Sequence, residues 1–165
     1  MLKAILFDLD NTLIDFMTMK KRCTEAAVTA MIDAGLEMDR KKAYKLMFEE
    51  YKKYGIEDQT IFQKFLQKHL KKVDYKILAA AIIAYRKVKS GQLVPYPHVR
   101  STLLALKERG LKLGIVSDAP RMQAWLRLTS MNLTDYFDVV LGYEDTGKLK
   151  PSVEPFRKAL KKMKL

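Results

Sequence analysis

A cluster of short polar side chains directly follows the first apolar segment of the chain. The run Asp-Leu-Asp-Asn-Thr comes after Ala-Ile-Leu-Phe and supplies Asp8, Asp10, Asn11 and Thr12. Two carboxylates so close together create a negative potential that Mg²⁺, a hard cation that takes oxygen ligands, can balance. One carboxylate can also attack phosphorus to form an aspartyl-phosphate, while the other protonates a leaving oxygen and later activates water. The alternative is purely structural, because Asp, Asn and Thr also build turns at strand ends.

Two other stretches carry groups that suit a phosphorylated ligand. Ser117 follows the apolar run Gly-Ile-Val, and its hydroxyl can donate to a phosphoryl oxygen or cap the next helix. Lys148 and Lys150 lie in Thr-Gly-Lys-Leu-Lys-Pro, where a lysine can neutralise phosphate charge. A single lysine in a chain with 31 Lys and Arg residues is by default a surface residue. No one of these stretches identifies a site by itself.

The elements that must position these groups follow from hydrophobic periodicity. Short apolar runs predict buried strands over 3–9, 111–117 and 137–141, and apolar spacing predicts helices over 98–109, 121–130 and from 153 onward. This order is typical of an α/β fold with a parallel sheet. In such sheets ligands bind beyond the carboxyl ends of the strands. Asp8 and Ser117 lie at two such ends, and the segment after the third strand leads to Lys150, so we expect the three to converge.

A block of helical patterns separates the first strand from the rest of the sheet. Apolar residues recur at helical spacing in four segments of residues 16–90, and their short connections favour an antiparallel bundle. We therefore predict an α/β core domain over 1–15 and 91–165 and a helical domain over 16–90. The residues that cap or stop these helices are expected to be Gly35, Asp39, Gly55, Asp58 and Asp74.

Taken together, the three stretches resemble the haloacid dehalogenase superfamily over nearly the whole chain. The family combines an apolar strand followed by Asp-x-Asp-x-Thr, a Ser or Thr that ends the next core strand, and a Lys that often precedes Pro and a Phe-containing helix. The matching residues are, in chain order, Asp8, Asp10 and Thr12, then Ser117, then Lys150 with Pro151 and Phe156. The helical block lies where the family inserts its type 1 cap. The resemblance implies a Rossmann-like parallel sheet with an inserted four-helix cap.

The resemblance also implies a Mg²⁺-dependent phosphatase that acts through an aspartyl-phosphate. Asp8 would attack phosphorus and bind Mg²⁺. Asp10 would serve as general acid and then as base, and its main-chain carbonyl would also bind the metal. Thr12 and Asn11 would support the loop, and Ser117 and Lys150 would hold phosphoryl oxygens. Because a cap of this type closes over the site, the expected substrate is a small phosphorylated metabolite.

Other functions remain open within and outside this scaffold. A 2-haloacid dehalogenase or a phosphomutase could use the same fold, although dehalogenases usually lack an acid where Asp10 stands. A non-catalytic binding or assembly module could keep the fold without the chemistry, because fold alone does not fix function.

One part of the family pattern has no counterpart in this sequence. The family's fourth motif is an acidic pair that supplies metal ligands, yet Glu154 is the only carboxylate side chain after Lys150. We therefore expect a core that is incomplete at its C-terminal end, as a fragment or a natural short form. Asp118 and Asp145 could partly replace the ligands, although Asp at such places is typical of caps and turns. The first strand, over 4–7, then becomes an exposed edge that favours a homodimer or poor solubility.

Composition argues against several other classes of protein. The chain has 165 residues, 48% hydrophobic, and contains no apolar stretch long enough to span a bilayer. Its single cysteine, Cys23, cannot form an internal disulfide, which is typical of a cytoplasmic protein. The net charge of +12 comes from lysines scattered along helical segments, a pattern that does not favour nucleic acid as the main partner. His69 and His98 are isolated and suggest no metal site, and we expect Trp125 to serve packing rather than recognition.

Overall fold

The computed structural model describes residues 2–165, and the chain divides into two compact units. One unit consists of the segment up to Phe16 together with Leu93–Leu165, and the other is Met17–Gln92. This division places Phe16 with the first unit, whereas Gly91 and Gln92 belong with the second. Within the described residues, no helix is both long enough and apolar enough to cross a membrane.

The first unit, here called the sheet unit, is built on three parallel strands. Their order is β1-β2-β3, with β2 in the middle. The α/β fold with a parallel sheet is therefore confirmed. In chain order the elements are β1 (Ala4–Phe7), α5 (Val99–Glu108), β2 (Lys112–Val116), α6 (Arg121–Ser130), the 3₁₀ turn η1 (Thr134–Tyr136), β3 (Val139–Leu141), the 3₁₀ turn η2 (Tyr143–Asp145) and α7 (Glu154–Lys162).

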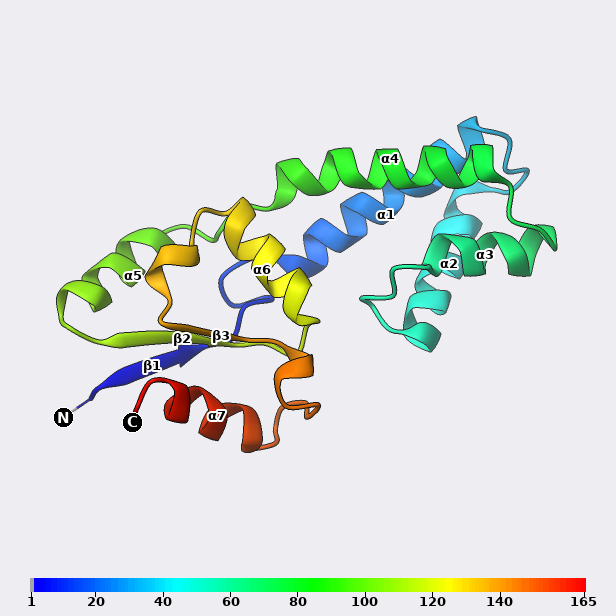
Figure 1. The fold of residues 1–165 in the computed structure, drawn as a ribbon. Helices are drawn as coiled ribbons and strands as arrows, with labels where there is room; N and C mark the ends of the chain where they lie inside the picture. Colours follow the sequence, from blue (N-terminus) through cyan, green and yellow to red (C-terminus); the bar gives the residue numbers. More distant parts are fainter. Residues whose placement is uncertain (1) are drawn as a thin grey trace. The chain divides into compact units, whose positions relative to one another are not determined.

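Helices cover both faces of this sheet, because successive side chains of a strand point to opposite sides. Leu113 and Ile115 of β2 belong to a core that includes α5 and α6. Val116 belongs to a second core with α7, and Gly114 lies against Met163 just after that helix. Figure 1 shows α7 on the other side of the sheet from α5 and α6. Burial on both faces explains why these strands are almost continuously apolar in sequence.

The second unit, here called the helical unit, contains four helices, most of whose apolar side chains form one core. Asp39 and Asp74 cap the second and fourth helices as predicted, since their carboxylates accept main-chain N–H groups of Lys42 (2.9 Å) and Lys76 (3.0 Å). An Arg22–Gln92 hydrogen bond of 2.9 Å joins the start of the first helix to the end of the fourth. The helices are α1 (Phe16–Asp33), α2 (Arg40–Tyr54), α3 (Ile61–Leu70) and α4 (Tyr75–Gln92).

Several local expectations are wrong in detail. The strands are shorter than their apolar runs, and α3 begins at Ile61 because the Asp58 carboxylate accepts the N–H of Thr60 (2.7 Å) before the helix starts. Trp125, which we expected to serve packing, is 40% exposed. The buried stripe of α6 instead passes through Ala124 and Leu128, which lie four residues apart on one face.

Candidate functional site at the strand ends

Asp8 and Lys150 meet where β1 and β2 end. The Lys150 ammonium lies 2.6 Å from Oδ1 of Asp8 and donates to the main-chain oxygen of Val116 at 2.9 Å. One cation therefore links the nucleophile candidate to the last residue of the neighbouring strand. The Asp8 side chain is still 40% exposed, so a ligand can reach its carboxylate from solvent.

The loop after Asp8 is held mainly by main-chain hydrogen bonds. The N–H of Asn11 donates to the carbonyl of Ile14 at 2.7 Å, and the N–H of Leu13 donates to that of Leu9 at 2.9 Å. Asn11 has a φ of 59°, a left-handed conformation that Asn tolerates better than most residues. The Thr12 hydroxyl lies 3.4 Å from Oδ2 of Asp8. Thr12 and Asn11 thus shape the turn that carries the first carboxylate.

Ser117 lies at the end of β2, and it is buried. Its main-chain N–H donates to the carbonyl of Leu141 at 3.0 Å, which joins the ends of β2 and β3. Its hydroxyl oxygen accepts the N–H of Ala119 at 3.1 Å. Because a hydroxyl can donate its own proton while it accepts another, the capping contact leaves Ser117 able to donate to a ligand.

Asp118 and Asp145 are engaged elsewhere. Asp118 accepts the main-chain N–H of Lys150 at 2.9 Å, which helps to place the lysine just before the cis Lys150–Pro151 peptide. Asp145 accepts the N–H of Gly142 at 2.9 Å and pairs with Arg121 at 3.2 Å. Within residues 2–165, no group of three or more His, Cys, Asp or Glu side chains is placed to hold a metal ion. Both carboxylates therefore accept hydrogen bonds that hold loops, which is the usual role of Asp at such places.

Arg127 of α6 is the residue that sequence reasoning missed. Its side chain is only 1% exposed, and Nη1 lies 2.8 Å from Oδ2 of Asp10. Its guanidinium carbon also lies 4.6 Å from the centre of the Phe16 ring. A buried arginine normally requires a charged or hydrogen-bonding partner. The only signal in the sequence is a charged residue within the apolar stripe of a helix, directly before the buried Leu128.

This arrangement suits chemistry on an anionic group. An ammonium lies beside an accessible carboxylate, a buried hydroxyl ends the adjacent strand, and a second carboxylate is oriented by a guanidinium. Fixed positive charges close to a carboxylate nucleophile can stabilise negative charge that develops on a transferred group. Lys148, by contrast, is exposed, and no contact joins it to Asp8.

Comparison with known proteins gives the family of this chain. The profile of the Haloacid dehalogenase-like hydrolase family matches residues 5–165. The glyceraldehyde 3-phosphate phosphatase of Methanocaldococcus jannaschii is 38% identical over 165 residues, which cover 100% of this chain and 72% of the relative. A protein of the same name from Methanothermobacter thermautotrophicus is 34% identical over 163 residues, with 99% and 72% covered.

Solved structures share the fold. The HAD phosphatase of Thermococcus onnurineus matches with a TM-score of 0.68 and 25% identity, covering 99% of this chain and 73% of that one. A crystal structure from Thermotoga maritima reaches a TM-score of 0.75 at 20% identity, with 99% and 72% covered. The strand-end arrangement, the family match and the relatives lead to one conclusion: the chain belongs to the haloacid dehalogenase-like hydrolase family.

Proposed function

We propose that this protein is a phosphatase that hydrolyses a small phosphorylated metabolite through an aspartyl-phosphate on Asp8. The observation that carries the proposal is the Asp8 carboxylate, partly open to solvent, with the Lys150 ammonium 2.6 Å away. The names of relatives at 34–38% identity, which refer to phosphatase activity on a small phosphorylated metabolite, support the same reaction class.

Each residue of the site has a defined task in this reaction. Oxygen of Asp8 forms a bond to phosphorus as the bond from phosphorus to the leaving oxygen breaks. Asp10, oriented by Arg127, gives its proton to the leaving oxygen and then removes one from the water that hydrolyses the aspartyl-phosphate. Lys150 and Ser117 hold the phosphoryl oxygens and stabilise their charge. Phosphate and the free hydroxyl compound are the products.

The donors at the strand ends fit Mg²⁺ in the way this ion is usually bound. Mg²⁺ often takes only one or two carboxylates and completes its shell with water and substrate phosphate. The Asp8 carboxylate and the main-chain carbonyl of Asp10 would hold it here. The ion would neutralise phosphate charge that Lys150 alone leaves unbalanced.

The test is hydrolysis of p-nitrophenyl phosphate with and without Mg²⁺ by the unaltered chain and by Asp8→Asn. We expect Mg²⁺-dependent turnover that falls at least about a thousandfold in the variant, because the amide cannot act as the nucleophile. Asp33→Asn, at an exposed position at the end of α1, is the matched control and should retain full activity. Circular dichroism checks that both variants remain folded. Turnover that survives in Asp8→Asn would contradict the proposed mechanism.

We also propose that two copies associate through β1. Among the described residues β1 pairs only with β2, so its outer edge offers unpaired main-chain groups that favour pairing with another strand. Light scattering after size exclusion should show a mass near twice 19.1 kDa. A single monomeric peak at high protein concentration would contradict this association.

A further inference from the structure

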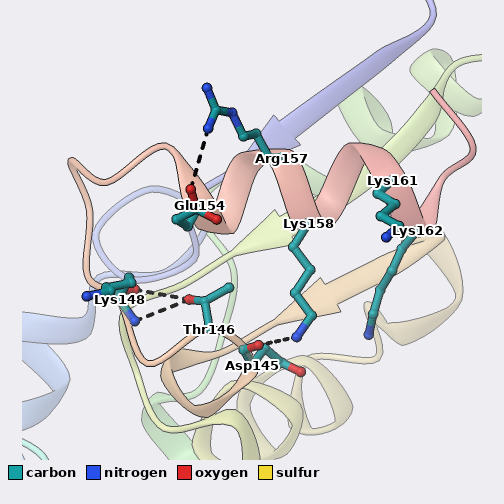
Figure 2. A pocket seen from close by; sticks show the side chains of 8 residues that line it. All are labelled: Asp145, Thr146, Lys148, Glu154, Arg157, Lys158, Lys161 and Lys162. Atoms are coloured by element: carbon teal, nitrogen blue, oxygen red, sulfur yellow. Dashed lines mark hydrogen bonds and ion pairs between the residues drawn. The ribbon is translucent and has the colours of Figure 1, made fainter.

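An open hollow of about 820 Å³ lies on the sheet unit, and neither Asp8 nor Lys150 lines it. Figure 2 shows it between α7 and the segment that follows η2. The hollow combines five cationic side chains with two acidic ones, and none of the residues proposed to act in phosphatase chemistry contributes to it. Its lining residues are Asp145, Thr146, Lys148, Glu154, Arg157, Lys158, Lys161 and Lys162.

Both acidic side chains of this hollow already have cationic or N–H partners. Glu154 pairs with Arg157 at 3.5 Å. The Asp145 carboxylate pairs with Arg121 at 3.2 Å and accepts the N–H of Gly142. Both carboxylates of the hollow are therefore already paired, and most of its lysine side chains have no carboxylate within the hollow to balance their charge.

Four of the lysines that line the hollow therefore form no ion pair with a carboxylate of residues 2–165. Over residues 2–165, no carboxylate forms an ion pair with Lys148, Lys161 or Lys162. Lys158 donates to the main-chain carbonyl of Asp145, which is a neutral acceptor. In Figure 2, Lys158 and Lys162 extend from the same side of α7, and Lys158 reaches Asp145. These positive charges would repel one another unless an anion or solvent screens them.

The positive charge of the sheet unit is concentrated in residues 148–165, which include most of the residues that line this hollow. Residues 148–165 contain seven Lys and Arg residues and one acidic residue, whereas the rest of the sheet unit contains seven and nine. The negative end of the α7 dipole favours cations in its last turn, which accounts for Lys161 and Lys162. The dipole does not account for Lys148, which lies outside the helix, or for Lys158 in its middle.

We propose that this hollow binds a small anion that carries several linked phosphate groups. Its volume lies in the range of small-ligand sites, and lysine ammonium groups bind phosphate as point charges. One phosphate cannot reach ammonium groups distributed along just over one turn of α7 and the facing segment, whereas a short oligophosphate can. An extended polyanion is disfavoured because the rest of the sheet unit carries a net negative charge.

The test measures tripolyphosphate binding by calorimetry, without divalent cations and in the Asp8→Asn background, so that no turnover consumes the ligand. We expect saturable binding that weakens as ionic strength rises. Lys161→Gln combined with Lys162→Gln should weaken binding at least about tenfold, since two charge-assisted contacts are lost. Lys71→Gln combined with Lys72→Gln is the matched control, because this exposed pair also lies at a helix C-terminus. It should change binding less than about twofold.

Three results would overturn the proposal. One is no saturable tripolyphosphate binding, and another is an equal loss in both double variants, which would show that net charge alone is responsible. The third is tighter binding of a single-stranded oligonucleotide or of anionic lipid vesicles than of tripolyphosphate at equal phosphate concentration. The outcome is independent of the proposed phosphatase activity, because binding is measured in a chain that lacks the nucleophile.

Discussion

Arg127 places a positive charge inside the sheet unit, where its guanidinium pairs with the Asp10 carboxylate that we propose as general acid. Such a pair contributes to orientation more reliably than to stability, since desolvation offsets much of the attraction between buried charges. The planar guanidinium also fixes the direction of its hydrogen bonds, which a lysine ammonium does not. At the scale of single residues, the position of Asp10 therefore depends on a side chain 117 positions away in sequence.

This dependence predicts a leaving-group effect in Arg127→Lys. The variant keeps the charge but loses the geometry that directs Asp10, so protonation of the leaving oxygen should suffer most. We expect kcat to fall about 10- to 100-fold for alkyl phosphates and much less for p-nitrophenyl phosphate, whose leaving group needs little protonation. The measurement is kcat over a series of esters of graded leaving-group pKa. Arg109→Lys, at an exposed position, is the control. An equal loss for every ester would mean that Arg127 has only a structural role.

The sequence located some groups of the site better than others. Asp8 and Ser117 could be placed because each follows an apolar run that forms a strand, and parallel strands bring these ends together. The choice of Lys150 over Lys148 came from the family resemblance, and the structure places the Lys150 ammonium beside Asp8. Arg127 could not be assigned to Asp10, because no local pattern reports a contact between residues so far apart.

At the scale of elements, the start of α6 is fixed against the turn that follows β3. The N–H of Arg121 donates to the Glu144 carboxylate at 2.6 Å, and this bond holds the pKa of Glu144 below its usual range. The N–H of Tyr143 donates to the carbonyl of Ala119 at 2.9 Å. Periodicity predicted α6 over its full length, but a three-residue turn such as η2 has too few residues to show any period.

This close packing predicts that Gly142→Ala destabilises the sheet unit. A Cβ at Gly142 would lie 2.6 Å from the main-chain nitrogen of Arg121, and a helix start cannot move aside cheaply. We expect the free energy of unfolding to fall by about 1–3 kcal/mol, measured by urea denaturation. Gly114→Ala should cost less, because one of its near contacts is the flexible end of Met163. Gly91→Ala meets nothing within 4 Å in α4 and should be neutral or stabilising. An equal loss at all three positions would contradict this account.

At the scale of the whole molecule, the buried side chains form separate cores. One core lies entirely within the helical unit, and the other two lie within the sheet unit. Each unit thus buries its own apolar surface, which is the condition for independent opening. The apolar periodicity of residues 16–90 predicted a helical block, and the contacts of the structure group Met17–Gln92 into one compact unit.

Separate cores predict that a cavity in one unit leaves the other protected. Phe65→Ala should lower the stability of the helical unit by about 3–5 kcal/mol, because Phe65 is fully buried there. Hydrogen exchange should then accelerate in Met17–Gln92 while amides of β2 keep their protection. Leu128→Ala, in the sheet core, is the reciprocal variant and should give the opposite pattern. Equal acceleration throughout the chain in both variants would show that the molecule unfolds as one cooperative unit.

The bond between Asp8 and Lys150 joins positions 142 residues apart, which matters during synthesis on the ribosome. Asp8 emerges 142 residues before the lysine whose ammonium pairs with it. The helical unit is continuous in sequence and can fold in the interval, since domains generally fold as units during translation. The first strand cannot form its sheet hydrogen bonds until β2, more than 100 residues later in sequence, has been synthesised. A nascent chain therefore carries the Asp8 carboxylate without its ion-pair partner until Lys150 has emerged as well.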